Sequence, residues 1–274
     1  MDLKITTIQF DIIWENKTAN LQKLDKILRG LPETDVIILP EMFTTGFSMS
    51  PEKLAEPMSG EVVNWLKIKA LSLNAAVTGS FICAENGQYF NRLIWMQPDG
   101  IFFQYDKRHL FSLAGEQAHY TEGSERITVE WRGWRICPLI CYDLRFPVWS
   151  RNTPNFQQSE TSKTVKINDT PYYDVLIYVA NWASARAHAW KSLLIARAIE
   201  NQTYVIGVNR VGLDGNNVEY NGDTAVIDYV GEKIFEVSGK EDFTTTILNR
   251  GKLMEFRNKF GFLTDQDSFK INVK

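Results

Sequence analysis

The sequence has few cysteines, no excess of charge of either sign and no long hydrophobic run. Three cysteines in 274 residues cannot form the disulfide framework of a small secreted domain. A formal net charge of −3 gives no general attraction to nucleic acid or anionic lipid, so we expect neither as a partner. No apolar run approaches the roughly 20 residues that a membrane span needs. Asp2, Lys4 and Asp11 also interrupt any signal-peptide core, so we expect a cytoplasmic protein.

Strand-like and helix-like stretches alternate along most of the chain. A chain of 274 residues can bury a sizeable core, and we expect a single domain over residues 1–274. Short apolar runs bounded by turn residues predict buried strands. Their alternation with helical patterns favours an α/β fold with buried sheets. The expected strands are 4–10, 35–40, 75–83, 91–96, 101–105, 134–140, 174–180, 203–209 and 224–229.

Local signals define several helices and turns. Leucines at helical spacing predict a helix over residues 16–28, and Ser59 is the expected N-cap of a second helix. Residues 98–100, Pro-Asp-Gly, predict a turn because proline sets φ and glycine tolerates positive φ. A third helix is expected where one helical face carries Trp190, Leu193, Leu194, Arg197 and Ala198.

One segment, residues 152–170, breaks this alternation. It is polar, and Phe156, Val165 and Ile167 are its only larger apolar residues. We interpret it as a surface insertion within the domain, with a flexible lid as the alternative.

Three reactive side chains each follow an expected strand. Glu41 comes after residues 35–40, Lys107 after residues 101–105, and Cys141 after residues 134–140. Ligands of α/β proteins tend to bind beyond the carboxyl ends of strands. A carboxylate can take the proton of a thiol, and an ammonium can stabilise the thiolate that then attacks an amide carbonyl. The Lys107 ammonium and the backbone N–H of Tyr142 are the expected donors to the resulting oxyanion.

Other interpretations of these residues remain open from spacing alone. Cys141 could be an inert core thiol, and Lys107 could belong to a basic surface patch. Cys83 and Cys137 lie inside expected strands, which favours core packing, and no second ligand pair completes a zinc site. A Cys–His protease or transferase is a rival, because His109, His119 or His188 could approach Cys141.

Three ordered motifs resemble those of the nitrilase superfamily, also called the carbon–nitrogen hydrolases. They are Leu39-Pro40-Glu41-Met42-Phe43, Tyr105-Asp106-Lys107-Arg108-His109-Leu110-Phe111 and Ile140-Cys141-Tyr142-Asp143-Leu144-Arg145-Phe146-Pro147. The resemblance implies that Glu41 is the general base, Lys107 the catalytic lysine and Cys141 the nucleophile. Glu116 matches a second glutamate of the family, which orients Lys107 and the substrate. The implied fold is a four-layer α-β-β-α sandwich, often paired into a homodimer.

Several stretches are similar to the omega-amidase branch of this superfamily, among them residues 42–47, 179–182 and 209–216. That similarity implies cofactor-free hydrolysis, through a cysteine thioester, of the terminal amide of 2-oxoglutaramate or 2-oxosuccinamate. The partners of the protein are then a small amide substrate and water. The alternatives are another thiol amidase or N-carbamoyl hydrolase of the superfamily, and a non-catalytic partner-binding protein with this fold.

A 2-oxo acid substrate requires a cation for its far carboxylate and an apolar slot for its short carbon chain. Arg186 is the expected cation, because it lies just beyond the strand that ends near Asn181. Phe43, Phe47 and Trp182 are the expected walls of the slot. Arg145 is expected to brace the loop that follows the nucleophile.

Overall fold

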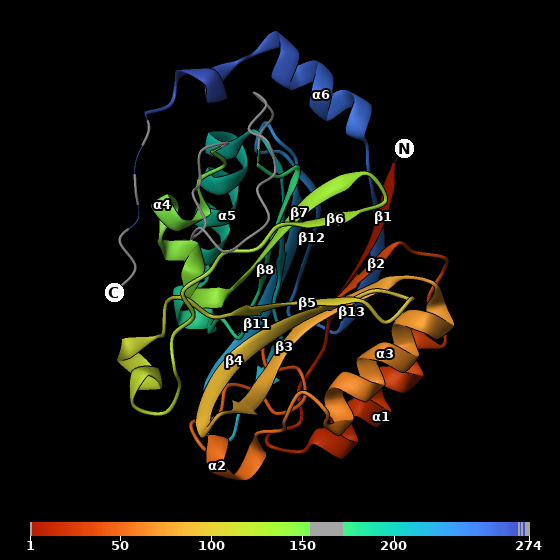
Figure 1. Ribbon diagram of the computed structural model, residues 1–274, viewed down its shortest axis with the longest axis vertical. Coiled ribbons are helices and arrows are strands. Elements are labelled where there is room, and N and C mark those ends of the chain that lie inside the picture. Colours follow the sequence, from red (N-terminus) through yellow and green to blue (C-terminus); the bar gives the residue numbers. More distant parts are fainter. Residues whose placement is uncertain (1, 154–171, 268, 270, 272–274) are drawn as a thin grey trace.

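Two β-sheets pack face to face, and helices cover their outer faces, giving the four layers of an α-β-β-α sandwich (Figure 1). The computed structural model describes residues 2–153, 172–267, 269 and 271. The predicted α/β class and the four-layer sandwich are therefore confirmed.

The first sheet has the strand order β13-β1-β2-β3-β4-β5. Strands β1, β2 and β3 are parallel, whereas β4 and β13 run antiparallel to their neighbours, so β5 points in the same direction as β2. Helices α1 (Lys17–Leu28) and α3 (Glu61–Leu73) lie on the outer face of this sheet, and the short α2 (Pro51–Leu54) lies near its end (Figure 1). The strands are β1 (Leu3–Gln9), β2 (Val36–Ile38), β3 (Ala76–Glu85), β4 (Gln88–Met96), β5 (Phe102–Asp106) and β13 (Asp242–Leu248).

The second sheet has the order β10-β11-β9-β8-β7-β6, with β12 also paired to β11. Its central strands β7, β8 and β9 are parallel. Helix α5 (Ala187–Asn201) packs on β9 and β11, α4 (Pro147–Ser150) lies beside it, and α6 (Arg250–Lys259) crosses the top of the view (Figure 1). The strands are β6 (Val129–Trp131), β7 (Trp134–Ile140), β8 (Val175–Val179), β9 (Tyr204–Val208), β10 (Val211–Leu213), β11 (Glu219–Ile227) and β12 (Lys233–Ser238).

The alternation of side chains along a strand explains the layering. On β2, Val36 and Ile38 belong to the core shared by the two sheets. Ile37 between them packs instead with the apolar faces of α1 and α3. Because both faces of β2 are buried, its sequence is a continuous apolar run and not an alternating one.

Most sequence-based boundaries are confirmed to within a few residues. The nine expected strands correspond to β1, β2, β3, β4, β5, β7, β8, β9 and the second half of β11. The helix expected over residues 16–28 is α1, which Asn16 caps through a hydrogen bond from the Ala19 N–H. The expected turn is confirmed by Gly100, which has a φ of +85°. Cys83 and Cys137 are buried in the core, as predicted.

One expected cap is wrong. Helix α3 begins at Glu61 with Gly60 in the N-cap position, so Ser59 lies one residue too early. The carboxylate of Glu56 accepts a hydrogen bond of 2.9 Å from the Val62 N–H. A side chain from the preceding segment therefore satisfies the helix terminus that Ser59 was expected to serve.

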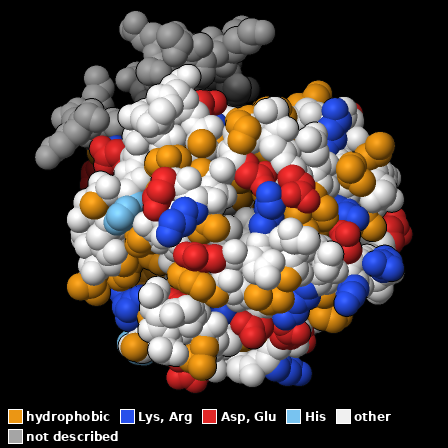
Figure 2. Space-filling view, turned by 90° about the horizontal axis from the view of Figure 1, so that it is seen from below, with side chains coloured by type: hydrophobic (Ala, Val, Ile, Leu, Met, Phe, Trp, Pro, Cys, Tyr) orange, Lys and Arg blue, Asp and Glu red, His pale blue; other side chains and the backbone are white. Residues whose placement is uncertain are grey.

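The expected insertion at residues 152–170 lies outside the described residues, apart from Asn152 and Thr153, which are both buried. Within the described residues, no helix is long and apolar enough to cross a membrane. The face shown in Figure 2 carries lysine and arginine interspersed with aspartate and glutamate, and hydrophobic side chains lie between them.

Candidate active site

The sandwich brings together the three strand ends that carry reactive side chains. Glu41 follows β2 and Lys107 follows β5, and these two strands point in the same direction within the first sheet. Cys141 follows β7 of the second sheet. The site is therefore built between the two sheets, whereas the sequence placed it only at strand ends.

A buried ion cluster surrounds Lys107. Its Nζ atom lies 2.9 Å from Oε1 of Glu41 and 2.8 Å from Oε2 of Glu116, and all three side chains are fully buried. Burial alone would lower the pKa of Lys107, but the charges of Glu116 and Glu41 raise it above its usual value. Burial also raises the pKa of Glu116, although the charge of Lys107 opposes the change. The lysine is thus held as an ammonium, and the two predicted glutamates flank it.

Two asparagines that the sequence did not single out hold the carboxylates of this cluster. The side-chain amide of Asn91 donates to Glu41 at 2.8 Å and to Glu116 at 3.4 Å. The backbone N–H of Asn181 donates to the other Glu41 oxygen at 2.7 Å. Buried carboxylates need such donors. An asparagine inside the apolar strand β4 was the available signal for Asn91.

Cys141 is held in a strained turn directly after β7. Its φ is +44°, a region that residues other than glycine rarely adopt and that is often found at functional sites. The residue is buried, with 8 % of its surface exposed. Burial, the charge of Glu41 and a hydrogen bond to Glu41 raise the pKa of the Cys141 thiol well above its usual value, and Lys107 opposes this. This environment favours the thiol form of Cys141, and its hydrogen bond places Glu41 to accept the proton.

Asp143 fixes the loop that follows Cys141. Its buried carboxylate accepts hydrogen bonds from the backbone N–H of Ile140 at 3.0 Å and from the hydroxyl of Tyr105 at 2.7 Å. It also lies 2.7 Å from Nδ1 of His109. This arrangement locks the end of β7 to the end of β5. The Tyr142 N–H lies in the first turn of the short 3-10 helix over residues 141–145, where the leading N–H groups lack partners within the helix.

The geometry disfavours a Cys–His pair. His109 is engaged with Asp143, and His119 and His188 are exposed. None of the three is among the residues that line the pocket containing Cys141. Within the part of the chain that the structure describes, no group of three or more His, Cys, Asp or Glu side chains could hold a metal ion.

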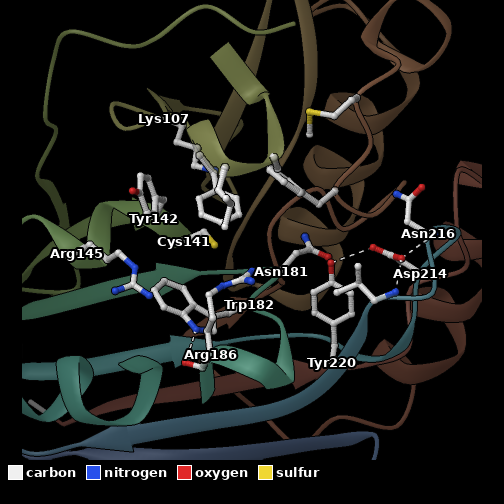
Figure 3. Close-up of a pocket in the computed structure, with 16 residues that line it drawn as sticks. Lys107, Cys141, Tyr142, Arg145, Asn181, Trp182, Arg186, Asp214, Asn216 and Tyr220 are labelled. Atoms are coloured by element: carbon white, nitrogen blue, oxygen red, sulfur yellow. Dashed lines mark hydrogen bonds between the residues drawn. The ribbon is translucent and has the colours of Figure 1, made fainter. Parts of the chain in front are cut away.

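A pocket of about 290 Å³ opens onto Cys141 and Lys107. Figure 3 shows Tyr142 and Arg145 on one side of Cys141, with Asn181, Tyr220 and Asp214 on the other. The lining residues are Phe47, Met49, Lys107, Phe111, Leu113, Ala114, Cys141, Tyr142, Arg145, Asn181, Trp182, Arg186, Asp214, Asn216, Val218 and Tyr220. A volume at the low end of the range for ligand sites indicates a small ligand.

The structure places most of the expected substrate-contacting residues in this pocket, with two differences. Arg186, Phe47 and Trp182 line it, whereas Phe43 is fully buried in the core against Trp65 and is not among the lining residues. Phe43 lies in the turn that follows β2 and packs in the core between the first sheet and its helices, so its expected place in the pocket is wrong.

Arg145 is the second difference. It was expected to brace the loop, but it lines the pocket with its guanidinium 5.0 Å from the ring centre of Trp182. Arg197 of α5 braces the loop instead, through a hydrogen bond of 2.6 Å from its guanidinium to the Leu144 carbonyl.

Comparison with known proteins supports a common origin over almost the whole chain. The carbon-nitrogen hydrolase family profile matches residues 4–257. Omega-amidase YafV of Escherichia coli (strain K12) is 45% identical over 273 residues, which is 98% of both chains. The 2-oxoglutaramate amidase of Bacillus subtilis (strain 168) is 31% identical over 97% of this chain and 98% of its own.

A solved structure shows the same fold in detail. The crystal structure of XC1258 from Xanthomonas campestris, described as a CN-hydrolase superfamily protein with an arsenic adduct in the active site, is 44% identical. It superposes with a TM-score of 0.93, covering 99% of this chain and 100% of the other.

Proposed function

This chain belongs to the carbon–nitrogen hydrolase family, in its omega-amidase branch, and we propose that it hydrolyses the terminal amide of a short 2-oxo acid monoamide through a thioester on Cys141. The substrates are of the class of 2-oxoglutaramate and 2-oxosuccinamate. The products are the dicarboxylic 2-oxo acid and ammonia. The names of two relatives, an omega-amidase and a 2-oxoglutaramate amidase, support this substrate class.

The observation that carries the proposal is a pair of arginines in the pocket that holds Cys141. Arg145 stacks on Trp182, and Arg186 stacks on Phe111 at 5.0 Å from its ring centre. Among the described residues, neither guanidinium forms an ion pair. Arginine matches a carboxylate through paired N–H donors, and stacking on a ring restricts its orientation.

The acidic residue of the pocket does not neutralise these cations. Asp214 accepts hydrogen bonds from the backbone N–H groups of Asn216 at 2.8 Å and Val218 at 3.0 Å, and from the hydroxyl of Tyr220 at 3.1 Å. Its carboxylate is therefore occupied in holding the segment between β10 and β11. The charges available to a ligand are positive, which favours an amide that also carries a carboxylate.

The first half of the reaction forms the thioester. Glu41 accepts the proton of the Cys141 thiol as the sulfur attacks the amide carbon, because the raised pKa of the thiol leaves little free thiolate. The carbonyl oxygen becomes an oxyanion, stabilised by the ammonium of Lys107 and the backbone N–H of Tyr142. Each such donor contributes roughly 3–4 kcal/mol in comparable oxyanion holes. The C–N bond then breaks, Glu41 returns the proton to nitrogen, and ammonia leaves.

The second half releases the acid. Glu41, again a carboxylate, takes a proton from water as the water oxygen attacks the thioester carbon. The C–S bond breaks, the sulfur regains the proton, and the free carboxylic acid departs. Glu116 holds Lys107 throughout, with hydrogen bonds of 3.0 and 2.8 Å. The reaction balances with amide, water and side chains alone.

Ammonia release from 2-oxoglutaramate tests the proposal directly. Wild type is expected to release ammonia from this substrate, but not from glutamine or a neutral aliphatic amide at comparable rates. Cys141→Ala is expected to abolish the activity. Activity on neutral amides or N-carbamoyl amino acids without activity on the 2-oxo acid amide would replace the proposed substrate class with another of the same family.

The two arginines can be tested separately from the chemistry. Arg145→Ala and Arg186→Ala are expected to raise KM for 2-oxoglutaramate much more than for a neutral amide. Only 2-oxoglutaramate has a carboxylate that loses its arginine partner. Arg29→Ala, an exposed arginine at the end of α1, is the matched control and should change neither. Equal losses on charged and neutral substrates would contradict the assignment of these arginines.

The homodimer and the cytoplasmic location stay predictions. Sedimentation equilibrium at several protein concentrations tests the first, and cell fractionation tests the second.

A further inference from the structure

Asn181 is fixed in one orientation by its contacts with Glu41. Its backbone N–H donates to Oε2 of Glu41 at 2.7 Å, and its side-chain Nδ2 donates to the Glu41 backbone carbonyl. A carbonyl oxygen can only accept, so the amide of Asn181 cannot be flipped without losing this bond. The remaining polar atom of the side chain, the acceptor Oδ1, is therefore directed away from the Glu41 backbone.

That acceptor is buried and unsatisfied. Oδ1 of Asn181 has no hydrogen-bond partner among the described residues, the residue is 5 % exposed, and its side chain lines the same pocket as Cys141. In Figure 3, Asn181 lies between Cys141 and the Asp214–Tyr220 pair, on the side of the sulfur opposite Arg145. An unpaired buried acceptor is costly and uncommon in proteins. Its persistence at the reacting centre indicates that a ligand supplies the donor.

We propose that Asn181 Oδ1 accepts a hydrogen bond from the N–H of the scissile amide and so selects amides over esters by their leaving group. This inference rests on the proposed amidase function. If Arg145 holds the carboxylate on one side of Cys141, the leaving nitrogen faces the other side, where Asn181 lies. Glu41 must reach that nitrogen to protonate it, and Asn181 contacts Glu41 through both its backbone and its side chain.

The hydrogen bond to Asn181 Oδ1 also distinguishes the amide substrate from the acid product and from ester analogues. An amide nitrogen offers a donor to Oδ1, whereas an ester oxygen or the carboxylate of the released acid offers only acceptors. Sites built to pair with a substrate N–H reject analogues that lack it, since the acceptor of the protein stays unpaired. Asn181 is thus a specificity-determining residue for the leaving group, distinct from the arginines that contact the acid end.

A matched amide and ester test this role. The substrates are 2-oxoglutaramate and the 5-methyl ester of 2-oxoglutarate, which yield the same thioester on Cys141 and differ only in the leaving group. Asn181→Ala is expected to lower kcat/KM for the amide roughly tenfold or more relative to its effect on the ester, as removal of one hydrogen bond implies. Asn181→Val, which keeps more of the side-chain volume but has no acceptor, should show the same selectivity if the alanine variant folds poorly.

Asn209→Ala is the matched control. Asn209 is buried and accepts a hydrogen bond from the Trp182 N–H at 2.8 Å and donates one to the Trp182 carbonyl at 2.9 Å. It supports the same loop but is not among the pocket-lining residues, so its loss should affect amide and ester equally.

The outcomes distinguish this inference from the proposed function. Equal losses on amide and ester in both Asn181 variants, with wild type active on both substrates, would overturn the role of Asn181 alone. A wild type that cleaves neither substrate would overturn the proposed function itself.

Discussion

The Glu41→Gln substitution is expected to slow amide hydrolysis while making Cys141 more reactive toward an alkylating agent. Burial raises the pKa of the Cys141 thiol, and Glu41, a charged neighbour that hydrogen-bonds the thiol, raises it further. Glutamine keeps the size of the side chain but removes the negative charge and the base. Hydrolysis needs the base, so kcat should fall at least about 100-fold. Alkylation needs only the thiolate, which the substitution stabilises.

The size of the second effect follows from Coulomb's law. One charge removed at about 4 Å, with an effective dielectric constant of about 20, changes the energy of the thiolate by roughly 4 kcal/mol, a factor of about 1000 in the ratio of thiolate to thiol. The thiolate fraction at pH 8 then rises up to about 1000-fold. Thiolates lose nucleophilicity as their pKa falls, with a Brønsted coefficient of about 0.4–0.5, so the alkylation rate should rise by roughly 30- to 60-fold.

The rate of inactivation by iodoacetamide between pH 7 and 10 measures this effect, with labelling followed by mass spectrometry. Cys141→Ala controls for modification of Cys83 and Cys137, both of which are buried. The pKa of the Cys141 thiol is raised, so the wild-type rate at pH 8 should lie below that of a free cysteine and keep rising at higher pH. A Glu41→Gln rate at pH 8 equal to or below that of wild type would refute the electrostatic reasoning.

Two further predictions concern residues outside the three motifs. Asn91→Ala removes two hydrogen bonds that hold Glu41 and Glu116, so kcat for ammonia release should fall about tenfold with little change in KM. An unchanged kcat would show that the remaining contacts of Glu41 and Glu116 are enough to position them. Gly207→Ala would place a Cβ atom 2.5 Å from Cδ1 of Leu194 on α5. This overpacking should lower the free energy of unfolding by about 2 kcal/mol and the Tm by roughly 4–8 °C. Differential scanning fluorimetry measures this shift, and an unchanged Tm would mean that α5 moves aside without cost.

Much of the site could be located from sequence because reactive residues directly follow apolar runs. Buried strands are continuous apolar runs in the sequence, so Glu41, Lys107 and Cys141 were placed at strand ends from the local pattern alone. The family resemblance then assigned a role to each, and it added Glu116. The residues that hold these groups in place gave weaker signals, since Asn91 and Asn181 act on Glu41 from 50 and 140 positions away in the chain.

The predictions from sequence were wrong where a different residue makes the contact that a nearby residue was expected to make, or where packing turns a side chain away from the pocket. Ser59 has the chemistry of an N-cap, but Glu56 satisfies the first turn of α3. Arg145 was interpreted as a loop brace from its position after the nucleophile, yet Arg197 of α5 takes that role. Phe43 was assigned to the pocket, but it packs in the core between the first sheet and its helices.

By itself, the sequence determined the α/β class, the positions of most elements and the chemical identity of the reacting groups, because periodicity, turn chemistry and side-chain type are local properties. Only the tertiary structure decided that Glu41 and Lys107 come from one sheet and Cys141 from the other. It also decided which arginines face the pocket and which polar atom remains unpaired there. These features depend on how two sheets pack and on which donors meet which acceptors across them, and no short stretch of the chain encodes that information.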